Sequence, residues 1–123
     1  MISFEYFVMQ DGSPIYMQIL LYIKRGIIAG IIKDGDELPS RRVLSATLGI
    51  NPNTVQKAYK LLEEEGLIAS RAGAKSYVVV TEMKWKEIRT ELLEDDAKIA
   101  VNSLKLMGVS KEEAHALIEK YWD

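Results

Sequence analysis

A short stretch near the middle of the chain is crowded with side chains that form directional hydrogen bonds. Five of the seven residues from 51 to 57 are of this kind: Asn51, Asn53, Thr54, Gln56 and Lys57. The amides of Asn and Gln can donate and accept together against the edge of adenine, and the methyl group of Thr can contact the methyl of thymine. This stretch therefore has the chemistry needed to read the base edges of DNA.

Signals on either side place these side chains in the first turn of a helix. Asn51 can serve as the N-cap with Pro52 at the first helical position, and Gly66 ends the pattern. A recognition helix presents its first turn to the major groove, because that end carries the positive end of the helix dipole and can reach the bases. The expected inward face of this helix consists of Val55, Ala58, Tyr59 and Leu62.

A shorter helix is expected directly before the base-reading helix. It is opened by Pro39 and Ser40, with Ser40 as the N-cap, and it is ended by Gly49. The free amides of a helix N-terminus and a nearby cation can hold a phosphate. Ser40 and Arg42 are therefore expected to fix the position of the protein on the DNA backbone. The expected buried positions of this helix are Val43, Leu44 and Leu48.

A hairpin is expected after the two helices. Residues 67–71 and 76–80 are β-prone runs, and they flank residues 72–75, which include Gly73. Arg71 and Lys75 would then lie on the hairpin, where they can enter the neighbouring minor groove or grip its backbone. Two helices joined by a tight turn and followed by a hairpin predict a winged helix-turn-helix.

The N-terminal third of the chain predicts one more helix. Ser13 can cap a helix that begins at Pro14, and Gly30 would end it. Residues 31–36 are expected to form a short extended piece and a turn with Gly35 at positive φ, which leaves Leu38 available to the core. The apolar face of this helix repeats at helical spacing through Ile15, Ile19, Ile23 and Ile27.

The last third predicts a tail of two helices. A long helix is expected over residues 83–106 with Gly108 as its stop, and Ser110 begins a last helix through a capping box with Glu113. A tail of about 40 residues is too small to enclose a drug-sized pocket, so its apolar stripes are expected to pair two copies of the chain. The expected dimerisation residues are Trp85, Ile88, Leu92, Ile99, Leu104, Leu117, Ile118 and Tyr121.

The expected architecture is mainly α with a small β-hairpin. Residues 1–80 are expected to form the winged helix-turn-helix DNA-binding domain, and residues 81–123 the C-terminal helical dimerisation segment. A length of 123 residues suits one compact domain with an appendage. Core packing is the favoured interpretation for Tyr59, and Arg41 and Lys60 are interpreted as solvated charges rather than as contacts.

The distribution of charge is compatible with a nucleic-acid partner despite a net charge of -2. Residues 39–81 carry six basic and three acidic side chains, whereas the segments on either side are net acidic. Field strength at the contact face matters more than the total charge. Since the local excess is modest, non-specific binding is expected to be weak and salt-sensitive, and a dimer is expected to be needed for enough phosphate contacts.

Composition disfavours several other classes of function. The chain contains no cysteine, which excludes disulfides, thiolate metal sites and cysteine nucleophiles. Neither a signal peptide nor a membrane-spanning run is visible, so a cytoplasmic location without a membrane partner is expected. His115, the one histidine, and the acidic cluster at residues 91–96 are interpreted as solvated surface groups. With no catalytic motif and no phosphate-cradling glycine loop, neither an enzyme nor a cofactor is expected.

Two motifs and the residues upstream of them can be compared with known families. Leu-Pro-Ser-Arg-Arg occupies residues 38–42 and Asn-Pro-Asn-Thr-Val occupies residues 51–55, with Gly66 after the second helix. This pattern resembles the GntR family of bacterial transcription regulators. With the upstream sequence Pro-Ile-Tyr-x-Gln-Ile at residues 14–19, it is similar to the YtrA subfamily of that family. The resemblance covers about residues 13–80, and the two-helix tail also fits.

The resemblance implies a homodimeric repressor that binds a palindromic double-stranded DNA operator, often one that controls its own operon together with ABC-transporter genes. It identifies no effector ligand. In the family, the positions matching Arg42 and the wing glycine Gly73 contact DNA. The matching positions at the start of the recognition helix, which also contact DNA, are Asn51, Pro52, Asn53, Thr54 and Gln56.

Two departures from the family pattern fall at positions expected to contact DNA. The family wing usually reads Gly-x-Gly, and Lys75 replaces the second glycine, although lysine adopts positive φ less readily. Pro52 stands where many members carry arginine, so a guanine contact from that side chain is absent.

The alternative to a DNA-binding function is a protein-protein interaction module that keeps the winged fold. The polar first turn of the base-reading helix argues against it, since a docking face would be more apolar there. The two interpretations differ in the expected salt dependence of binding to duplex DNA.

Overall fold

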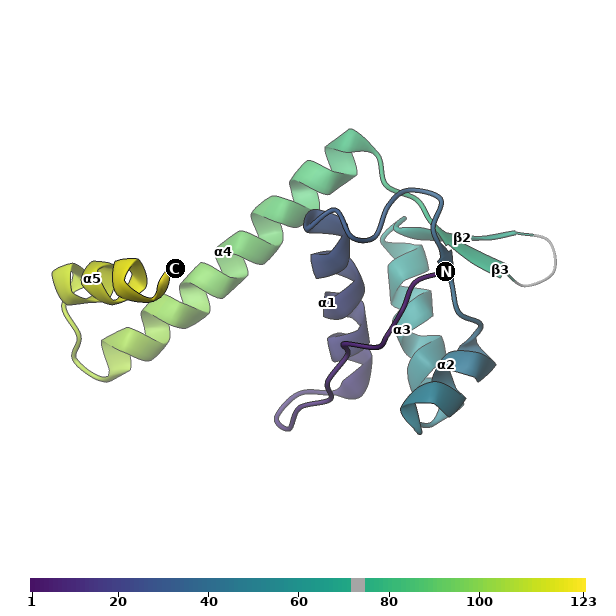
Figure 1. Cartoon of the computed structure of the whole chain (residues 1–123), viewed down its shortest axis with the longest axis horizontal. Helices are drawn as coiled ribbons and strands as arrows, with labels where there is room; N and C mark the ends of the chain where they lie inside the picture. The colour runs from purple at the N-terminus through teal and green to yellow at the C-terminus, as the bar shows by residue number, and fades with distance from the viewer. Residues whose placement is uncertain (72–74) are drawn as a thin grey trace. The chain divides into compact units, whose positions relative to one another are not determined.

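The computed structural model describes residues 1–71 and 75–123, which divide into two compact units, Met1–Ile88 and Arg89–Asp123. We refer to them as the winged-helix unit and the tail unit. The mainly α fold with a small antiparallel sheet, expected from the sequence, is confirmed. Figure 1 labels the elements in chain order, which are α1 (Ile15–Ile28), β1 (Glu37–Leu38), α2 (Arg41–Leu48), α3 (Pro52–Glu64), β2 (Ile68–Arg71), β3 (Lys75–Val78), α4 (Glu82–Leu106) and α5 (Lys111–Tyr121).

The core of the winged-helix unit lies between α1 and α3, which pack side by side (Figure 1). The predicted inward face of α3 is confirmed, because Val55, Ala58, Tyr59 and Leu62 are all buried. Three isoleucines of α1, at positions 19, 23 and 27, are buried as well. Each such aliphatic side chain contributes about 1.5–3 kcal/mol relative to an exposed one. This packing fixes which face of α3 is left for solvent.

The turn between α2 and α3 is built by the predicted caps. Ser40 Oγ accepts a hydrogen bond from the amide of Val43 at 3.1 Å, and Asn51 Oδ1 accepts one from the amide of Asn53 at 2.8 Å. Gly49 ends α2 in the left-handed conformation with φ of 67°, which glycine adopts without steric cost. The short helix, the tight turn and the capped second helix are therefore confirmed.

The predicted inner face of α2 is wrong at Val43, and Leu48 is only half-buried. Val43 is 53% exposed, and Ser45 is buried instead, one residue after the buried Leu44. The hydroxyl of Ser45 donates to the carbonyl of Ile50 at 2.9 Å, which satisfies a polar group inside the core and ties α2 to the turn. An eight-residue helix offers too few turns for apolar spacing to define its inner face.

A hydrogen bond within the core joins the start of α2 to α3. The Tyr59 hydroxyl donates to the Pro39 carbonyl oxygen at 2.6 Å. Burial raises the pKa of this hydroxyl, an effect that the nearby Arg41 guanidinium opposes. The group therefore remains a protonated donor at neutral pH. Core packing, the favoured interpretation of Tyr59, is confirmed.

The sheet contains one strand more than the predicted hairpin. β3 pairs with both neighbours, antiparallel, in the order β1-β3-β2. The strand β1 is only two residues long, too short to give an alternating pattern, and its Leu38 is buried as expected. Lys75 belongs to β3 rather than to the turn. Gly73 lies outside the described residues.

The predicted start of α1 is also wrong. The N-cap is Pro14, its side chain cannot accept a hydrogen bond, and Ser13 precedes it without capping the helix. The Gln18 side chain holds this loop instead. It accepts from the amide of Gln10 at 2.9 Å and donates to the carbonyls of Gln10 and Ser13 at 2.8 and 2.9 Å. A glutamine in the first turns of the helix thus fixes the preceding loop, and the helix itself has no side-chain cap.

Two apolar side chains near the start of the chain pack into the core of the winged-helix unit, a contact that no pattern in the sequence predicted. Ile2 and Phe4 are buried, and the amide of Ile2 donates to the carbonyl of Glu37 at 2.8 Å. Phe4 stacks on Tyr22 of α1 with ring centroids 4.9 Å apart, and the Tyr22 hydroxyl donates to the Ser3 carbonyl. Such aromatic pairs add about 0.5–1.5 kcal/mol beyond their buried area.

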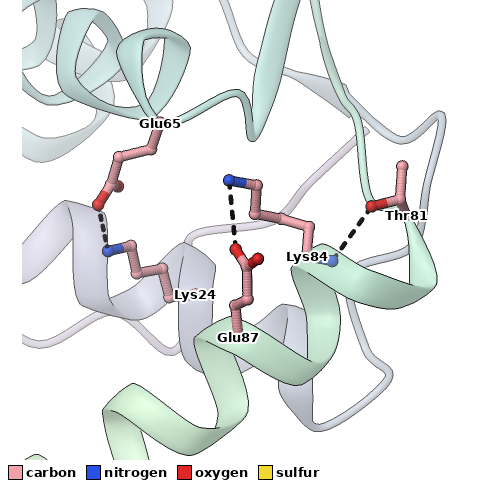
Figure 2. Close-up of polar contacts among 5 residues, drawn as sticks. All are labelled: Lys24, Glu65, Thr81, Lys84 and Glu87. Atoms are coloured by element: carbon pink, nitrogen blue, oxygen red, sulfur yellow. Dashed lines mark hydrogen bonds and ion pairs between the residues drawn. The ribbon is translucent and has the colours of Figure 1, made fainter.

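A buried lysine connects α1 to the end of α3. Lys24 Nζ lies 2.9 Å from Glu65 Oε1, and the lysine side chain is 5% exposed whereas the glutamate is 42% exposed (Figure 2). Glu65 is the C-cap of α3 and follows Glu63 and Glu64, so three carboxylates stand at the negative end of the helix dipole. The buried ammonium offsets part of that unfavourable charge.

The first turns of α4 belong to the winged-helix unit. Thr81 Oγ1 accepts from the amide of Lys84 at 3.1 Å, and Lys84 Nζ lies 3.7 Å from Glu87 (Figure 2). Trp85 Nε1 donates to the carbonyl of Ile27 at 3.3 Å, and Ile88 is 4% exposed. These contacts attach the start of α4 to α1.

The tail unit has little core of its own. Within it, α4 continues to Leu106, the chain turns at Gly108, and α5 begins with Ser110 as its predicted N-cap, accepting from the amide of Glu113 at 3.2 Å. No residue of α5 is buried. The larger exposed apolar side chains of the unit are Leu93, Ile99, Val101, Leu106, Met107, Ile118, Tyr121 and Trp122.

The bond between Tyr59 and Pro39 gives a first prediction. Tyr59→Phe leaves the buried carbonyl without this donor, so we expect the free energy of unfolding in urea to fall by about 1–3 kcal/mol. Tyr77→Phe is the matched control, because the Tyr77 hydroxyl has no hydrogen-bond partner within residues 1–71 and 75–123 and its loss should change little. Equal losses in the two variants would contradict the role given to Tyr59.

The ion pair of Lys24 and Glu65 gives a second prediction. Glu65→Ala leaves a buried ammonium without its counter-charge, whereas Lys24→Met places an apolar chain there and leaves a half-exposed carboxylate to water. We expect Glu65→Ala to reduce the free energy of unfolding by about 2 kcal/mol more than Lys24→Met does, less than for a fully buried pair. Urea denaturation measures both, with Glu64→Ala as the control. The reverse order would refute this account.

Candidate nucleic-acid interface

The first turn of α3 presents polar side chains to solvent. Asn51, Pro52, Asn53 and Gln56 are exposed, and Thr54 is half-buried. The cap uses the oxygen of Asn51 but leaves its two amide N–H donors free to bind elsewhere. Among the described residues, the side chains of Asn53 and Gln56 have no hydrogen-bond partner. Their amides therefore retain the full donor and acceptor pair that a bidentate contact to adenine requires.

Lys57 lies against α1 in this structure. Its ammonium is 4.0 Å from the centroid of the Tyr16 ring, and the residue is exposed. An exposed cation–π contact of this kind is worth about 0.5–1 kcal/mol. That energy is small enough for the ammonium to exchange the ring for a phosphate.

Two of the predicted backbone contacts flank the start of α2. Ser40 and Arg42 are exposed. The Ser40 oxygen accepts the cap hydrogen bond, and its hydroxyl proton is still able to donate to an anion. Because the Tyr59 hydroxyl holds Pro39, the start of α2 is tied to the same helix that carries the polar first turn. This hydrogen bond, together with the packing of α2 on α3, brings the two groups of predicted contacts together.

Arg41 differs from the expected solvated charge. It is only partly exposed, and its guanidinium carbon lies 5.3 Å from the centroid of the buried Tyr59 ring. Its Nε is buried and has no hydrogen-bond partner within the part of the chain that the structure describes. Sequence reasoning missed this position because Arg41 and Arg42 are identical neighbours, and only the fold separates the stacked side chain from the exposed one.

The wing, formed by β2 and β3, places two cations opposite each other. Arg71 and Lys75 are cross-strand partners and are both exposed. The Arg71 guanidinium also lies 4.6 Å from the centroid of the Tyr77 ring, which holds it along β3. Like charges directly opposite on a sheet are destabilising. The wing therefore concentrates positive charge at the point where the described strands end.

The predicted dimerisation residues fall into two groups. Trp85 and Ile88 pack within the winged-helix unit and are used inside a single chain. The others lie in the tail unit, where Ile99 is 68% exposed. Ile118 and Tyr121 are also exposed, and three leucines are half-buried, at positions 92, 104 and 117.

The described ranges contain no cluster of metal ligands but do contain a small hollow. Three or more His, Asp or Glu side chains do not gather anywhere in them as a metal site would require. A hollow of about 280 Å³ lies at the end of α5, which is small for a ligand pocket. The residues lining the hollow are His115, Ile118, Glu119, Trp122 and Asp123.

No helix within residues 1–71 and 75–123 combines the length and the apolar character needed to cross a lipid bilayer.

Comparison with known proteins agrees with this geometry. The family described as bacterial regulatory proteins, gntR family, matches residues 15–78, which run from α1 to β3. The HTH-type transcriptional repressor YtrA of Bacillus subtilis is 36% identical over 111 residues, which cover 90% of this chain and 81% of that relative.

Solved structures show the same likeness over most of the chain. A GntR family transcriptional regulator from Listeria monocytogenes has a TM-score of 0.79 at 30% identity, covering 91% of this chain and 98% of that one. YtrA from Sulfolobus acidocaldarius, a GntR-family transcription factor, has a TM-score of 0.54 at 32% identity, covering 91% and 90%.

The family match covers the complete helix-turn-helix and both strands of the wing that the structure describes. The relatives are transcription regulators rather than enzymes. The chain is therefore a member of the GntR family of DNA-binding transcription regulators.

Proposed function

We propose that the chain acts as a homodimeric repressor that binds a palindromic operator, with two winged heads on half-sites about one helical turn apart. The observation that carries the proposal is the first turn of α3, which is capped, exposed and fixed to α2 through Tyr59 and Pro39. Bidentate pairing with a base needs side chains held in a defined geometry. A packed helix with unpaired amides at its tip meets that need.

The proposed contacts divide into readers and positioning groups. Asn53 and Gln56 read bases, because their amides are unpaired, and they are flanked by Asn51, Pro52 and Thr54. Ser40 and Arg42 hold phosphates and set the orientation of α3. Lys57 adds a phosphate contact when its ammonium leaves the Tyr16 ring.

The wing extends the footprint in this proposal. Arg71 and Lys75 repel each other across β2 and β3 in the free protein. A phosphate or a narrow minor groove next to them would convert that repulsion into a favourable interaction with DNA. Gly73, which matches the wing glycine of the family and lies outside the described residues, completes the proposed set of contacts.

Dimerisation through the tail is supported by its exposed apolar side chains. A monomeric soluble protein rarely leaves so much apolar surface uncovered, and a second copy would bury it. Because Trp85 and Ile88 already pack within the winged-helix unit, the proposed interface begins beyond them. Its residues are Leu92, Ile99, Leu104, Leu117, Ile118 and Tyr121.

The proposal that the chain represses transcription, and the proposed identity of the regulated genes, rest on similarity to known proteins. The Bacillus subtilis relative is named a transcriptional repressor, and its alignment with this chain includes part of the tail unit as well as the winged-helix unit. Resemblance to the YtrA subfamily extends the proposal to an operon that contains ABC-transporter genes. Repression would follow from occupation of an operator that overlaps the promoter.

Base readout and backbone positioning predict different mutant behaviour. A palindrome is first selected with the wild-type chain from a random duplex pool. We expect Asn53→Ala to relax preference at one base pair and to weaken cognate binding by about 1–3 kcal/mol, whereas Arg42→Ala weakens cognate and scrambled duplexes equally. Fluorescence anisotropy measures both affinities.

Two outcomes would count against this function. An equal loss on cognate and scrambled DNA for Asn53→Ala would remove its reading role. Failure of the wild-type chain to enrich any palindrome, together with no dependence of binding on salt, would favour a protein-docking module over a DNA reader.

The proposed dimer interface predicts a matched pair of tail variants. Ile118→Asp places a charge in the apolar stripe of α5, so we expect sedimentation to show monomers at concentrations where the wild type is dimeric. Ala116→Asp adds the same charge to the same helix two residues away, off the stripe, and should leave the dimer intact. Equal sedimentation of the two variants would contradict this interface.

A further inference from the structure

Arg41 is a partly buried cation without a counter-charge among residues 1–71 and 75–123. Its guanidinium carbon lies 5.3 Å from the centroid of the Tyr59 ring, so the planar group rests against a side chain of α3 that is itself 1% exposed. Tyr59 is itself anchored in the core, because its hydroxyl donates to the Pro39 carbonyl at 2.6 Å. The guanidinium is therefore held in place by the core rather than free in solvent.

Burial of the Arg41 side chain has an unfavourable component that no described residue offsets. The Nε of Arg41 is buried without a hydrogen-bond partner, and no carboxylate within the described ranges forms an ion pair with the residue. A buried unpaired donor is uncommon in native proteins, and each one calls for an explanation in structure or function. A partly desolvated charge also binds an anion more strongly than a solvated one does, since water competes less.

The location of Arg41 identifies the anion. It is the first residue of α2, between Ser40 and Arg42, the two groups proposed to hold DNA phosphates. The same guanidinium rests on α3, whose first turn is proposed to enter the major groove. We propose that Arg41 binds a phosphate of the operator backbone through its terminal nitrogens, and so links the position of the backbone to the orientation of α3.

The chemistry of the guanidinium suits this role. Its terminal nitrogens carry four of its five N–H donors and match the geometry of a phosphate, whereas the inward Nε fixes the plane of the group. Because the positive charge is shared over all three nitrogens, a phosphate at the outer edge neutralises the charge that burial of Nε has partly desolvated. A lysine at this position would keep the charge but lose the stacking and the paired donors.

This inference rests on the proposed DNA-binding function and is tested by the salt dependence of operator binding. For the wild-type chain and Arg41→Gln, the logarithm of the association constant is plotted against the logarithm of the salt concentration. Each phosphate neutralised contributes about 0.9 to the slope. We expect Arg41→Gln to reduce the magnitude of the slope by about 0.9 per winged-helix unit and to weaken binding about tenfold at fixed salt.

Lys33→Gln is the control for a simple change in net charge. Lys33 is exposed in the turn before β1, and its removal changes the charge of the chain by the same amount. We expect its slope to equal that of the wild type. An equal change in slope for Lys33→Gln and Arg41→Gln would overturn the inference, because the effect would then be a general property of the charge.

Thermal unfolding separates binding from stability. Arg41→Gln removes a partly buried charge with an unpaired donor, so its melting temperature should stay close to that of the wild type while DNA affinity falls. Arg41→Lys should restore most of the slope and only part of the affinity. A loss of affinity with an unchanged slope would show a purely structural role and would refute the inference.

Failure of this inference and failure of the proposed function give different results. If the wild-type chain binds a selected palindrome and Arg41→Gln matches it in slope and affinity, Arg41 is not a phosphate contact and the proposed function stands. If the wild-type chain binds no duplex even at low salt, the proposed function falls, and this inference falls with it.

Discussion

Burial of one face of α3 determines which side chains the winged-helix unit presents to solvent. Val55, Ala58, Tyr59 and Leu62 are all inside the core, and shifting the helix by one residue would rotate it by about 100° and expose several of them. The orientation of the first turn is therefore set by apolar packing rather than by the polar residues that it carries. The Tyr59 hydroxyl extends the same constraint to the start of α2 through Pro39. The groups proposed to read bases and those proposed to hold the backbone thus share one support, as accurate contact with a duplex requires.

The two compact units differ in how they are stabilised. The winged-helix unit has a continuous core, to which Phe4 adds by stacking on Tyr22 of α1, and Trp85 adds from the start of α4. In the tail unit, by contrast, α5 has no buried residue, although its cap and apolar spacing are those of a stable helix. Association of two copies would supply the tail with the core that it lacks. In this view the stability of the tail and the assembly of the dimer are the same event.

Local signals in the sequence were sufficient for much of this structure. The caps at Ser40 and Asn51, the glycine stop at Gly49 and the helical spacing of α3 each depend on neighbouring residues only, and each is found in the structure. Contacts between distant parts of the chain were not predictable in the same way. The pairing of Glu37 with Tyr77, the ion pair of Lys24 with Glu65 and the packing of two apolar side chains near the start of the chain all require the fold to be known. Arg41 belongs to this second class, since its contact with Tyr59 joins residues 18 positions apart.

The distribution of charge along α3 also affects how the winged-helix unit approaches DNA. Its first turn carries no acidic residue, whereas its C-terminal end has three successive glutamates, of which Glu65 is paired with Lys24. The peptide dipole has the same sense as these side chains, positive at the first end and negative at the last. A helix polarised in this way experiences a torque in the field of a polyanion, which turns its amide end forward during approach. Encounters in the opposite orientation would be repelled before any base is touched. A chain with a net charge of -2 can therefore be guided to DNA by the asymmetry of one helix rather than by overall attraction.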